Sequence, residues 1–379
     1  MIKFVIITHV PHLFENSSYY AYGPYVHEMN IWSNYVDELV VVAPMVKAER
    51  TKIDNFYTHK KIRFLLIPSF DVLSLKGFFL TFLKFPKLLF VIFKAMKAAD
   101  HIHLRCPGNI GLHGCLIQIL FPNTPKTAKY AGNWDPTSKQ PWSYRLQKWI
   151  LSNTFLTRKM QVLVYGEWPD QSKNITPFFT ATYSENEKLP MQSLNLNGNI
   201  NFIFVGSLVK GKNPLYAIRL VECLLKNKHN ISLNIYGDGI LKAELEKYIR
   251  EYYLENSIFL HGNQDQETLK KAYQESHFVI LASDSEGWPK AIAEGMFWGC
   301  VPLATAVSCV PFMLDHGKRG VLLDVDLKKD VKKTEMLLND QTDFYAKSVK
   351  ASEWSGNYTL DVFEKGIKNL LKQDSTHKG

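Results

Sequence analysis

The stretch that decides the fold is F-V-I-L-A-S-D-S-E-G-W-P-K-A-I-A-E-G-M-F-W-G-C-V-P-L-A-T, residues 278–305. Its first five residues are apolar and have the length of a buried strand. A polar loop follows, and Pro289 stands at the expected start of a helix, where its fixed φ and missing N–H are tolerated. Gly299 ends that helix, because glycine adopts a left-handed backbone at low cost. The apolar run from Val301 predicts a second buried strand.

Two carboxylates flank the predicted start of this helix. Glu286 lies in the loop just before it, and Glu294 lies about one and a half turns into it. The N-terminus of a helix suits an anion such as a diphosphate, and neighbouring carboxylates can hold hydroxyl groups. The bland alternative is a βα turn with two solvated glutamates. We favour a ligand site, because open α/β sheets bind ligands at the carboxyl ends of buried strands.

The same stretch resembles the E-x7-E signature of the family 4 retaining glycosyltransferases. The positions shared with the family's usual text are Ser283, Glu286, Gly287, Glu294, Met296, Gly299, Pro302, Ala304 and Thr305. Three positions depart from that text: Trp288 replaces a phenylalanine, Pro289 a glycine and Gly295 an alanine. The resemblance implies the GT-B fold, an α/β architecture of two Rossmann-like, doubly wound parallel-sheet domains that face a central cleft.

A second loop, V-G-S-L-V-K-G-K-N-P at residues 205–214, resembles the family's G-R-L-x-x-x-K-G segment, whose arginine and lysine neutralise the donor diphosphate. Lys212 matches that lysine, but Ser207 stands at the position of the arginine. Lys210 can supply part of the missing charge. Two solvated lysines in a surface turn are the alternative. We favour phosphate binding, because this loop and the loop of Glu286 are expected to converge at one edge of a sheet.

The resemblance also assigns roles within the donor site. Glu286 would bind sugar hydroxyls, Glu294 the ribose, and Lys212 the diphosphate, with Glu286 and Lys212 counted as catalytic. A glycine turn at Gly237 would lie near the nucleotide, and main-chain groups near Asn263 would hold the base. The full set of predicted donor-binding residues is Gly206, Ser207, Lys210, Lys212, Gly237, Asn263, Glu286, Gly287, Trp288, Pro289, Lys290 and Glu294.

The N-terminal half offers fewer matches to the family. Gly23 is either a remnant of the family's glycine-rich turn on the acceptor side or part of an ordinary loop over residues 9–24. Where many members have a histidine after the fifth strand, this chain has Asn133 and Asp135. We predict Asp135 as a catalytic contact to acceptor or sugar, with a simple turn at Asp135-Pro136 as the alternative. Asn133 and Trp134 are predicted to stack on or hydrogen-bond a sugar.

Apolar runs of strand length alternate with helical patterns along most of the chain, as in parallel sheets covered on both faces. Residues 184–200 are polar without a clear period, and we predict them to be the interdomain linker. The predicted domains are an N-terminal acceptor domain of residues 1–183, completed by a C-terminal helix of residues 354–379, and a nucleotide-sugar donor domain of residues 201–353.

The chain has 379 residues and a formal net charge of +9. Its five cysteines are scattered without a C-x-x-C pair, which favours a reducing compartment and argues against structural zinc. Residues 1–8 run directly into a strand-like segment, so we expect no signal peptide and a cytoplasmic protein. No nucleic-acid partner is expected, because the basic residues are spread and no known motif is present.

Residues 76–99 combine many phenylalanines with lysines. This combination predicts a peripheral contact with an anionic membrane, which would lie at its inner face. The alternative is a crossover helix whose lysines are merely solvated, and both can hold at once.

The resemblance implies a retaining, metal-independent hexosyltransferase. Such an enzyme moves a hexose-type sugar from a nucleoside-diphosphate sugar to a glycan or lipid-linked acceptor, as in the synthesis of cell-surface polysaccharides. No cofactor and no metal are expected, because the D-x-D pattern occurs only late in the chain, at Asp324-Val325-Asp326. Two alternatives stay open: a nucleotide-sugar 2-epimerase, and a non-catalytic nucleotide-sugar-binding protein, which the serine at Ser207 and the missing histidine support.

Overall fold

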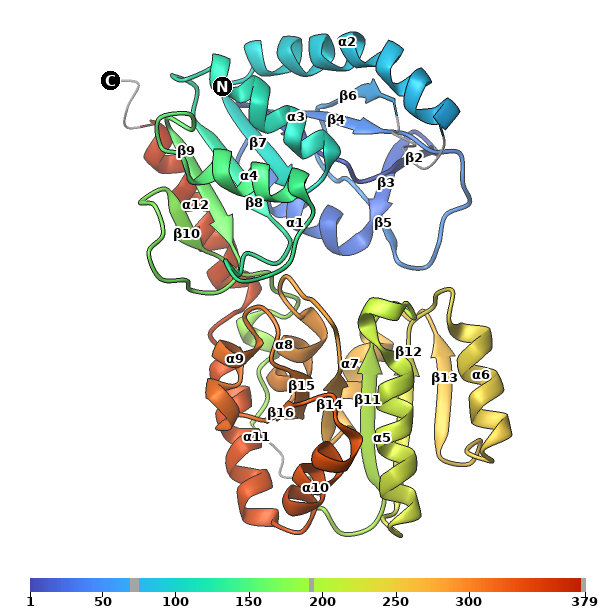
Figure 1. Cartoon of the computed structure of the whole chain (residues 1–379). Coiled ribbons are helices and arrows are strands. Elements are labelled where there is room, and N and C mark those ends of the chain that lie inside the picture. The colour runs from blue at the N-terminus through green and yellow to red at the C-terminus, as the bar shows by residue number, and fades with distance from the viewer. Residues whose placement is uncertain (69–74, 191–193, 376–379) are drawn as a thin grey trace. The chain divides into compact units, whose positions relative to one another are not determined.

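The computed structural model describes residues 1–68, 75–190 and 194–375, and it describes the side chains of all of these except 75–85 and 373–375. The chain forms two compact units, shown in Figure 1. Unit 1 contains residues 1–179 and 364–379, and unit 2 contains residues 180–363.

Unit 1 is built on a parallel sheet of seven strands in the order β10-β9-β8-β7-β1-β4-β6. The strands are β1 (Lys3–Ile7), β4 (Glu38–Pro44), β6 (Ile62–Ile67), β7 (His101–Cys106), β8 (Lys126–Tyr130), β9 (Met160–Val164) and β10 (Ile175–Pro177). The central strands are buried along nearly their whole length, which explains their near-continuous apolar sequences. The chain runs outward from β1 to β4 and β6 and then returns to β7 beside β1.

The helices of unit 1 follow from this order of strands. Because crossovers are right-handed, a helix lies on one face of the sheet when the chain moves across the sheet in one direction, and on the other face when it moves back. The three helices α2 (Leu75–Lys97), α3 (Asn109–Ile117) and α4 (Trp142–Ser152) therefore form one layer, and α1 (Gly23–Ser33) covers the other face. The short η1 helix (Gln118–Leu120) extends α3. The last helix, α12 (Leu360–Ser375), belongs to unit 1 from Glu364 onward.

The segment of residues 9–24 is not the loop that we predicted. It folds into an antiparallel hairpin of β2 (His12–Glu15) and β3 (Ser18–Tyr22), and β5 (Asp54–Phe56) adds a third strand. Asn16 and Ser17 both have a positive φ, as the tight turns of two-residue hairpins require. Gly23 begins α1, and a Cβ at this position would lie only 2.3 Å from the carbonyl oxygen of Ile53. Close packing of main chains is therefore a sufficient reason for this glycine.

Unit 2 contains a six-stranded parallel sheet in the order β13-β12-β11-β14-β15-β16. Its strands are β11 (Ile200–Val205), β12 (Ile231–Tyr236), β13 (Ile258–Gly262), β14 (Phe278–Leu281), β15 (Val301–Thr305) and β16 (Val321–Leu323). Its helices are α5 (Pro214–Lys226), α6 (Lys242–Glu251), α7 (Gln266–Gln274), α8 (Lys290–Phe297), α9 (Val310–Met313), α10 (Leu327–Leu338) and α11 (Gln341–Ser355). The prediction of a doubly wound parallel sheet in each half of the chain is confirmed.

The chain crosses between the units at residues 179–180 and again at residues 363–364. Residues 184–200, the predicted linker, fall within unit 2 and include a short 3-10 helix, Glu185–Glu187. Residues 191–193 of that segment lie outside the described residues. The membrane prediction for residues 76–99 falls on α2, and the side chains of residues 76–85 are likewise not described.

Two charged side chains, Glu28 and Lys129, are buried beneath the carboxyl ends of the strands of unit 1, and Arg105 beside them is 11% exposed. The Arg105 guanidinium forms an ion pair of 2.9 Å with the Glu28 carboxylate. Lys129 is fully buried and its ammonium donates a hydrogen bond of 3.0 Å to the carbonyl oxygen of Phe179. Burial lowers the pKa of Lys129 from 10.5 to about 7, with the Glu28 carboxylate opposing the shift and Arg105 adding to it.

Replacing Lys129 by Met tests this burial. The unfolded chain binds a proton at Lys129 up to a pH near 10.5, whereas the folded chain releases it above about 7. The wild type should therefore gain stability as pH rises through this window, by at most roughly 1.4 kcal/mol per pH unit. The Lys129→Met variant lacks this gain, so its stability relative to wild type should fall from pH 7 to pH 10 in urea unfolding. A difference that is independent of pH would contradict the assignment.

Candidate functional site

The candidate site lies where the sheet of unit 2 changes direction. The chain starts at β11, moves outward to β12 and β13, and returns to β14 beside β11. The carboxyl ends of β11 and β14 are consequently neighbours at the topological switch point, where open α/β sheets bind ligands. The loop after β11 contains Lys212, and the loop after β14 contains Glu286.

These two loops are joined by one ion pair and one main-chain hydrogen bond. The Lys212 Nζ lies 2.5 Å from the Glu286 Oε1. Beside it, the N–H of Asp284 donates to the carbonyl oxygen of Gly211 at 2.9 Å. The Glu286 side chain is 6% exposed and that of Lys212 is 30% exposed. The structure thus joins two residues that are 74 positions apart in the sequence and whose loops were predicted to converge at one edge of a sheet.

The loop after β11 reaches α5 through a short 3-10 turn, Lys210–Lys212, and through Asn213 in a left-handed conformation. Pro214 then begins α5, as its fixed φ favours. Asn213 occupies the N-cap position, but its side chain makes no capping hydrogen bond, so the capping that its sequence position favours is absent. Ser207 and Lys210 are both exposed in this loop.

The loop after β14 is held by residues that follow the neighbouring strand β15. The carbonyl oxygen of Gly287 accepts hydrogen bonds from the Ser308 hydroxyl at 3.2 Å and from the Cys309 thiol at 3.3 Å. Pro289 lies at the N-cap position of α8, one residue before the first helical residue, and not inside the helix as predicted. Trp288 is 7% exposed and packs near Trp354. The loop is therefore held in one shape ahead of α8.

Glu294 lies on the second turn of α8 and is largely buried. Its Oε1 accepts a hydrogen bond of 2.6 Å from the Thr182 hydroxyl, and its Oε2 accepts one of 3.1 Å from the Tyr273 hydroxyl. The Lys290 ammonium lies 3.6 Å from Oε1. Burial and the Glu294 carboxylate raise the pKa of Tyr273 well above its usual range, so Tyr273 stays protonated and acts as a donor. The remaining lone pairs of the carboxylate can accept hydroxyl groups of a ligand.

Two glycine turns pack main chain against main chain beside the Lys212 loop. A Cβ at Gly237 would lie 1.9 Å from the carbonyl oxygen of Gly206, and one at Gly239 would lie 2.5 Å from that of Leu208. The N–H of Leu208 also donates to the carbonyl oxygen of Asp238 at 2.9 Å. Glycine is required at both turns because no side chain fits between the two loops.

The predicted base-binding position lies on the next strand outward. Asn263 follows β13, and the carbonyl oxygen of Gly262 accepts a hydrogen bond of 2.9 Å from the N–H of Gly237. Along this edge of the sheet, the predicted donor residues therefore follow the order of the strands β13, β12, β11 and β14.

The predicted residues of unit 1 have mainly local structural roles. The Asp135 Oδ1 accepts hydrogen bonds of 2.8 Å from the N–H and the hydroxyl of Thr137, which is the turn that we gave as the alternative. The Asn133 Oδ1 accepts from the N–H of Asp135 at 2.9 Å. Trp134 is 2% exposed and its indole N–H donates to Gln171 at 2.8 Å. The prediction that Trp134 stacks on a sugar is therefore wrong for this structure, because its ring belongs to the core.

Sequence reasoning missed a cluster at the switch point of unit 1, between β1 and β7. His9 follows β1, and its ring lies against Gly108, where a Cβ would be 2.9 Å from the His9 Nδ1. Burial, and to a smaller extent Arg105, lower the pKa of His9, so its imidazole is neutral near pH 7. The signal that could have found this cluster is the position of His9 and Arg105 at the ends of adjacent strands.

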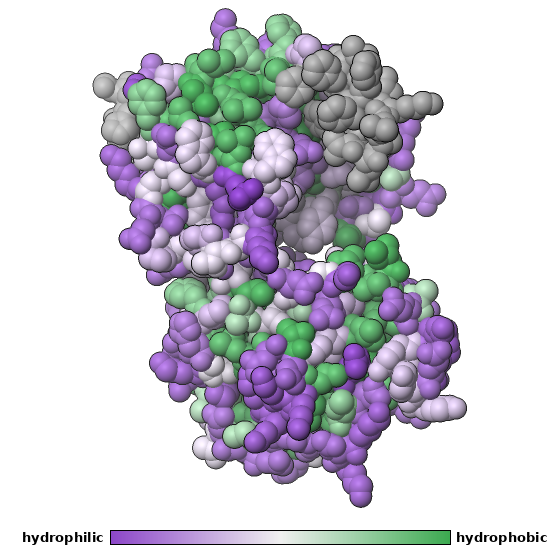
Figure 2. Space-filling model, viewed as in Figure 1, coloured by the Kyte–Doolittle hydropathy of each residue, from purple (hydrophilic) through white to green (hydrophobic). Residues whose placement is uncertain are grey.

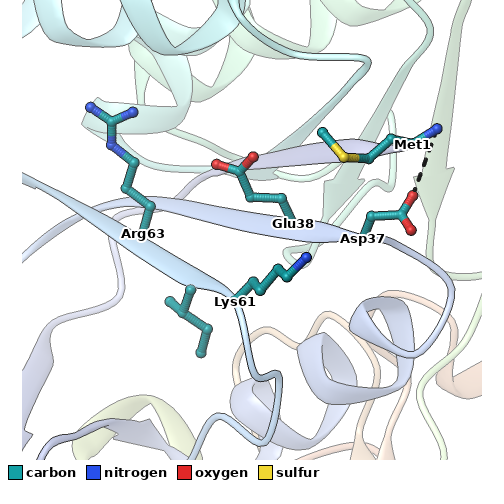
Figure 3. A pocket seen from close by; sticks show the side chains of 6 residues that line it. Met1, Asp37, Glu38, Lys61 and Arg63 are labelled. Carbon is teal, nitrogen blue, oxygen red and sulfur yellow. Dashed lines mark ion pairs between the residues drawn. The ribbon is translucent and has the colours of Figure 1, made fainter.

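A pocket of about 250 Å³ lies at the amino ends of the strands of unit 1, opposite to the carboxyl ends where His9 and Arg105 lie. Figure 3 shows its lining side chains, which come from the amino ends of β1, β4 and β6: Met1, Asp37, Glu38, Lys61, Ile62 and Arg63. The terminal ammonium of Met1 lies 3.9 Å from the Asp37 carboxylate. Because ligands of open α/β sheets bind at the carboxyl ends of strands, we do not assign the candidate site to this pocket.

The D-x-D pattern near β16 is used by local structure. The Asp326 side chain accepts from the N–H of Lys329 at 3.2 Å and so caps α10, and the Asp324 carboxylate lies 3.1 Å from the Lys333 ammonium. Among the residues whose positions are described, no group of three or more His, Cys, Asp or Glu side chains is arranged to hold a metal ion.

Residues 185–353 match the family model described as "Glycosyl transferases group 1". An uncharacterised glycosyltransferase of Haemophilus influenzae is 25% identical over 206 residues, which cover 53% of this chain and 57% of that protein. The poly(glycerol-phosphate) alpha-glucosyltransferase of Bacillus subtilis is 24% identical over 202 residues, or 53% of this chain and 25% of that protein. This chain thus spans between a quarter and three fifths of the length of these two relatives.

The solved structures support the fold. The structure of HepE from Anabaena in complex with UDP-glucose matches with a TM-score of 0.70 at 12% identity, covering 98% of this chain and all of that one. This likeness shows the fold alone: two Rossmann-like parallel-sheet units of the GT-B class.

The packing of α8 on β14 explains why Gly295 replaces the alanine of the family text, and it gives a testable prediction. A Cβ at Gly295 would lie 2.6 Å from the Val279 Cγ1. Gly295→Ala should therefore lower the free energy of unfolding by about 1–3 kcal/mol. In urea titrations, the Gly295→Ala/Val279→Ala double variant should lose less than the sum of the two single losses. Strictly additive losses would show that the two side chains do not compete for this space.

Proposed function

We propose that this protein is a retaining glycosyltransferase that moves a hexose-type sugar from a nucleoside-diphosphate sugar to a glycan or lipid-linked acceptor in cell-surface polysaccharide synthesis. The observation that carries the proposal is the Lys212–Glu286 pair at the switch point of unit 2, directly before α8. The match of residues 185–353 to group 1 glycosyl transferases and the glucosyltransferase among the relatives support it.

In this proposal the diphosphate of the donor binds between Lys212 and the N-terminus of α8. The ammonium supplies a positive charge, and the N-terminus of α8 supplies main-chain N–H donors and a favourable dipole. The phosphate oxygens compete with Glu286 for Lys212. The carboxylate of Glu286 is then able to accept hydrogen bonds from the hydroxyls of the sugar. The ion pair can therefore hold the two loops together before the donor binds. After the donor binds, Lys212 contacts the diphosphate and Glu286 contacts the sugar.

Glu294 would bind the two ribose hydroxyls. Thr182 and Tyr273 fix one carboxylate oxygen each, so the side chain cannot rotate away from α8. The neighbouring HepE structure contains a uridine diphosphate sugar, so uridine diphosphate glucose is the first donor to test.

The chemical step would proceed on one face of the sugar, with retention at the anomeric carbon. The bond from this carbon to the diphosphate oxygen breaks, and the bond to the acceptor oxygen forms on the same face. The leaving diphosphate takes the proton of the acceptor hydroxyl. Lys212 and the N-terminus of α8 would stabilise the negative charge that grows on the diphosphate, and the protein would otherwise act by orienting both substrates.

The Glu286 carboxylate gives the first test. Glu286→Ala should reduce sugar transfer by about a hundredfold or more, because an interaction that orients the reacting sugar is lost. The assay measures release of uridine diphosphate from a panel of uridine diphosphate sugars with poly(glycerol phosphate) and lipid-linked glycans as acceptors. The melting temperature should change little, since Lys212 can turn to solvent.

A matched control for this variant is Glu251→Ala, which removes the same charge from an exposed ion pair with Lys247 on α6. This control should transfer sugar at the wild-type rate. Wild-type transfer by Glu286→Ala itself would remove Glu286 from the mechanism.

The second test concerns metal ions. Because Lys212 and α8 neutralise the diphosphate in this proposal, transfer in excess EDTA should stay within about a factor of two of the untreated rate. Loss of transfer in EDTA that added Mg²⁺ or Mn²⁺ restores would contradict the charge assignment.

A further inference from the structure

The positive charge of this chain is concentrated in one segment. Residues 75–160 contain thirteen lysines and arginines, two aspartates and no glutamate, which gives a formal charge of +11. The whole chain carries +9, so the remaining residues together carry −2. This segment supplies α2, α3, η1 and α4, the layer of helices on one face of unit 1. Seven of the thirteen basic residues lie in α2 and α4, and the four helices of the layer contain no acidic residue, whereas Arg105, Lys126 and Lys129 lie in the strands β7 and β8.

The outer surface of the same layer exposes large apolar side chains. Figure 2 shows hydrophobic residues gathered over α2 and α3 in unit 1. Among the side chains that are described, the large exposed apolar ones of this layer and of the turn after α4 are Phe90, Phe93, Leu116, Leu120, Trp142, Trp149 and Phe155. We refer to these residues, together with the exposed basic residues Lys87, Lys94, Lys97, Arg145 and Arg158, as the docking face.

Apolar and basic side chains alternate within the docking face. On α2, Leu88, Ile92 and Met96 are buried in the core of unit 1. The opposite side of the helix carries Phe90, which lies one helical turn from both Lys87 and Lys94. In the turn after α4, the Arg158 guanidinium lies 4.9 Å from the centre of the exposed Phe155 ring. A solvated face would not need these aromatic rings.

We propose that the docking face binds the surface of an anionic lipid bilayer. Trp and Phe side chains enter the boundary between headgroups and acyl chains, and Lys and Arg side chains bind anionic headgroups beside them. Over the described ranges 1–68, 75–190 and 194–375, no helix is long and apolar enough to cross a membrane, so the contact is one of α-helices that lie on the surface.

The charge of the face argues for lipid over the other occupants of an apolar surface. A second copy of this chain would bring two strongly basic layers together, and like charges would oppose the contact. A bilayer with anionic headgroups instead neutralises the lysines and buries the aromatic rings at once. The inference rests on the proposed function, because a bilayer surface presents lipid-linked acceptors. Vesicle binding is measured without sugar transfer, so it can fail or succeed independently of the proposed reaction.

The test is sedimentation of the full chain with vesicles of two compositions. The chain should bind vesicles of mixed phosphatidylcholine and phosphatidylglycerol and should bind pure phosphatidylcholine at least about tenfold more weakly. Trp149→Ser/Phe155→Ser should weaken binding to the mixed vesicles about tenfold or more. Lys94→Glu/Lys97→Glu should weaken binding to the mixed vesicles by at least roughly fivefold for each positive charge removed. Added salt should weaken the binding of the wild type in the same way.

Two control variants in unit 2 match these changes. Ile240→Ser/Tyr253→Ser removes two highly exposed apolar side chains, and Lys328→Glu/Lys332→Glu reverses two exposed charges on α10. Both should bind mixed vesicles like the wild type. Equal binding to neutral and anionic vesicles, equal losses in the controls, or a dimer in sedimentation that Trp149→Ser/Phe155→Ser dissociates without lipid binding would each overturn the proposal.

Discussion

The candidate site depends on the contact between the loop after β11 and the loop after β14. The order of strands in unit 2 makes their carboxyl ends neighbours, and the ion pair between Lys212 and Glu286 spans the two loops. A carboxylate as buried as Glu286 loses much of its hydration, and a nearby ammonium only partly compensates for that loss. Such a pair contributes little to stability, and in the proposed function a charged ligand shares it.

The surrounding packing keeps this contact in one geometry. Gly237 lets the loop after β12 touch the main chain of the loop after β11 at Gly206, and Gly295 lets α8 approach β14 closely. Thr182 and Tyr273 fix the carboxylate of Glu294 on the same helix. Main-chain N–H groups and charges that the surrounding packing holds in place suit the proposed stabilisation of charge on a leaving diphosphate.

Most of the fold could be predicted from the sequence because its signals are local. Buried strands of a parallel sheet have continuous apolar sequences, and the loop–helix unit before Glu294 contains its own proline and glycine. The hairpin of β2 and β3 was missed, since its strands are only four and five residues long and neither shows a clear alternation of apolar and polar residues. The fate of Trp134 was also missed, because whether an aromatic ring enters the core or faces solvent depends on the packing of distant elements.

The site itself was predictable only in part, for the same reason. The sequence predicts that the loops of Lys212 and Glu286 converge at one edge of a sheet, but the ion pair between the two side chains is seen only in the structure. In unit 1 the family pattern directed attention to Asp135, which turns out to stabilise a turn, while the ends of β1 and β7 place His9 and Arg105 together.

The most direct test of the account is the affinity of uridine diphosphate, measured by titration calorimetry for the wild type and for Lys212→Met. If Lys212 holds the diphosphate, the substitution should weaken binding by about ten- to a hundredfold and should affect uridine monophosphate much less. An unchanged affinity for the diphosphate would show that the charge at the switch point does not bind phosphate, and the account of the site would fail.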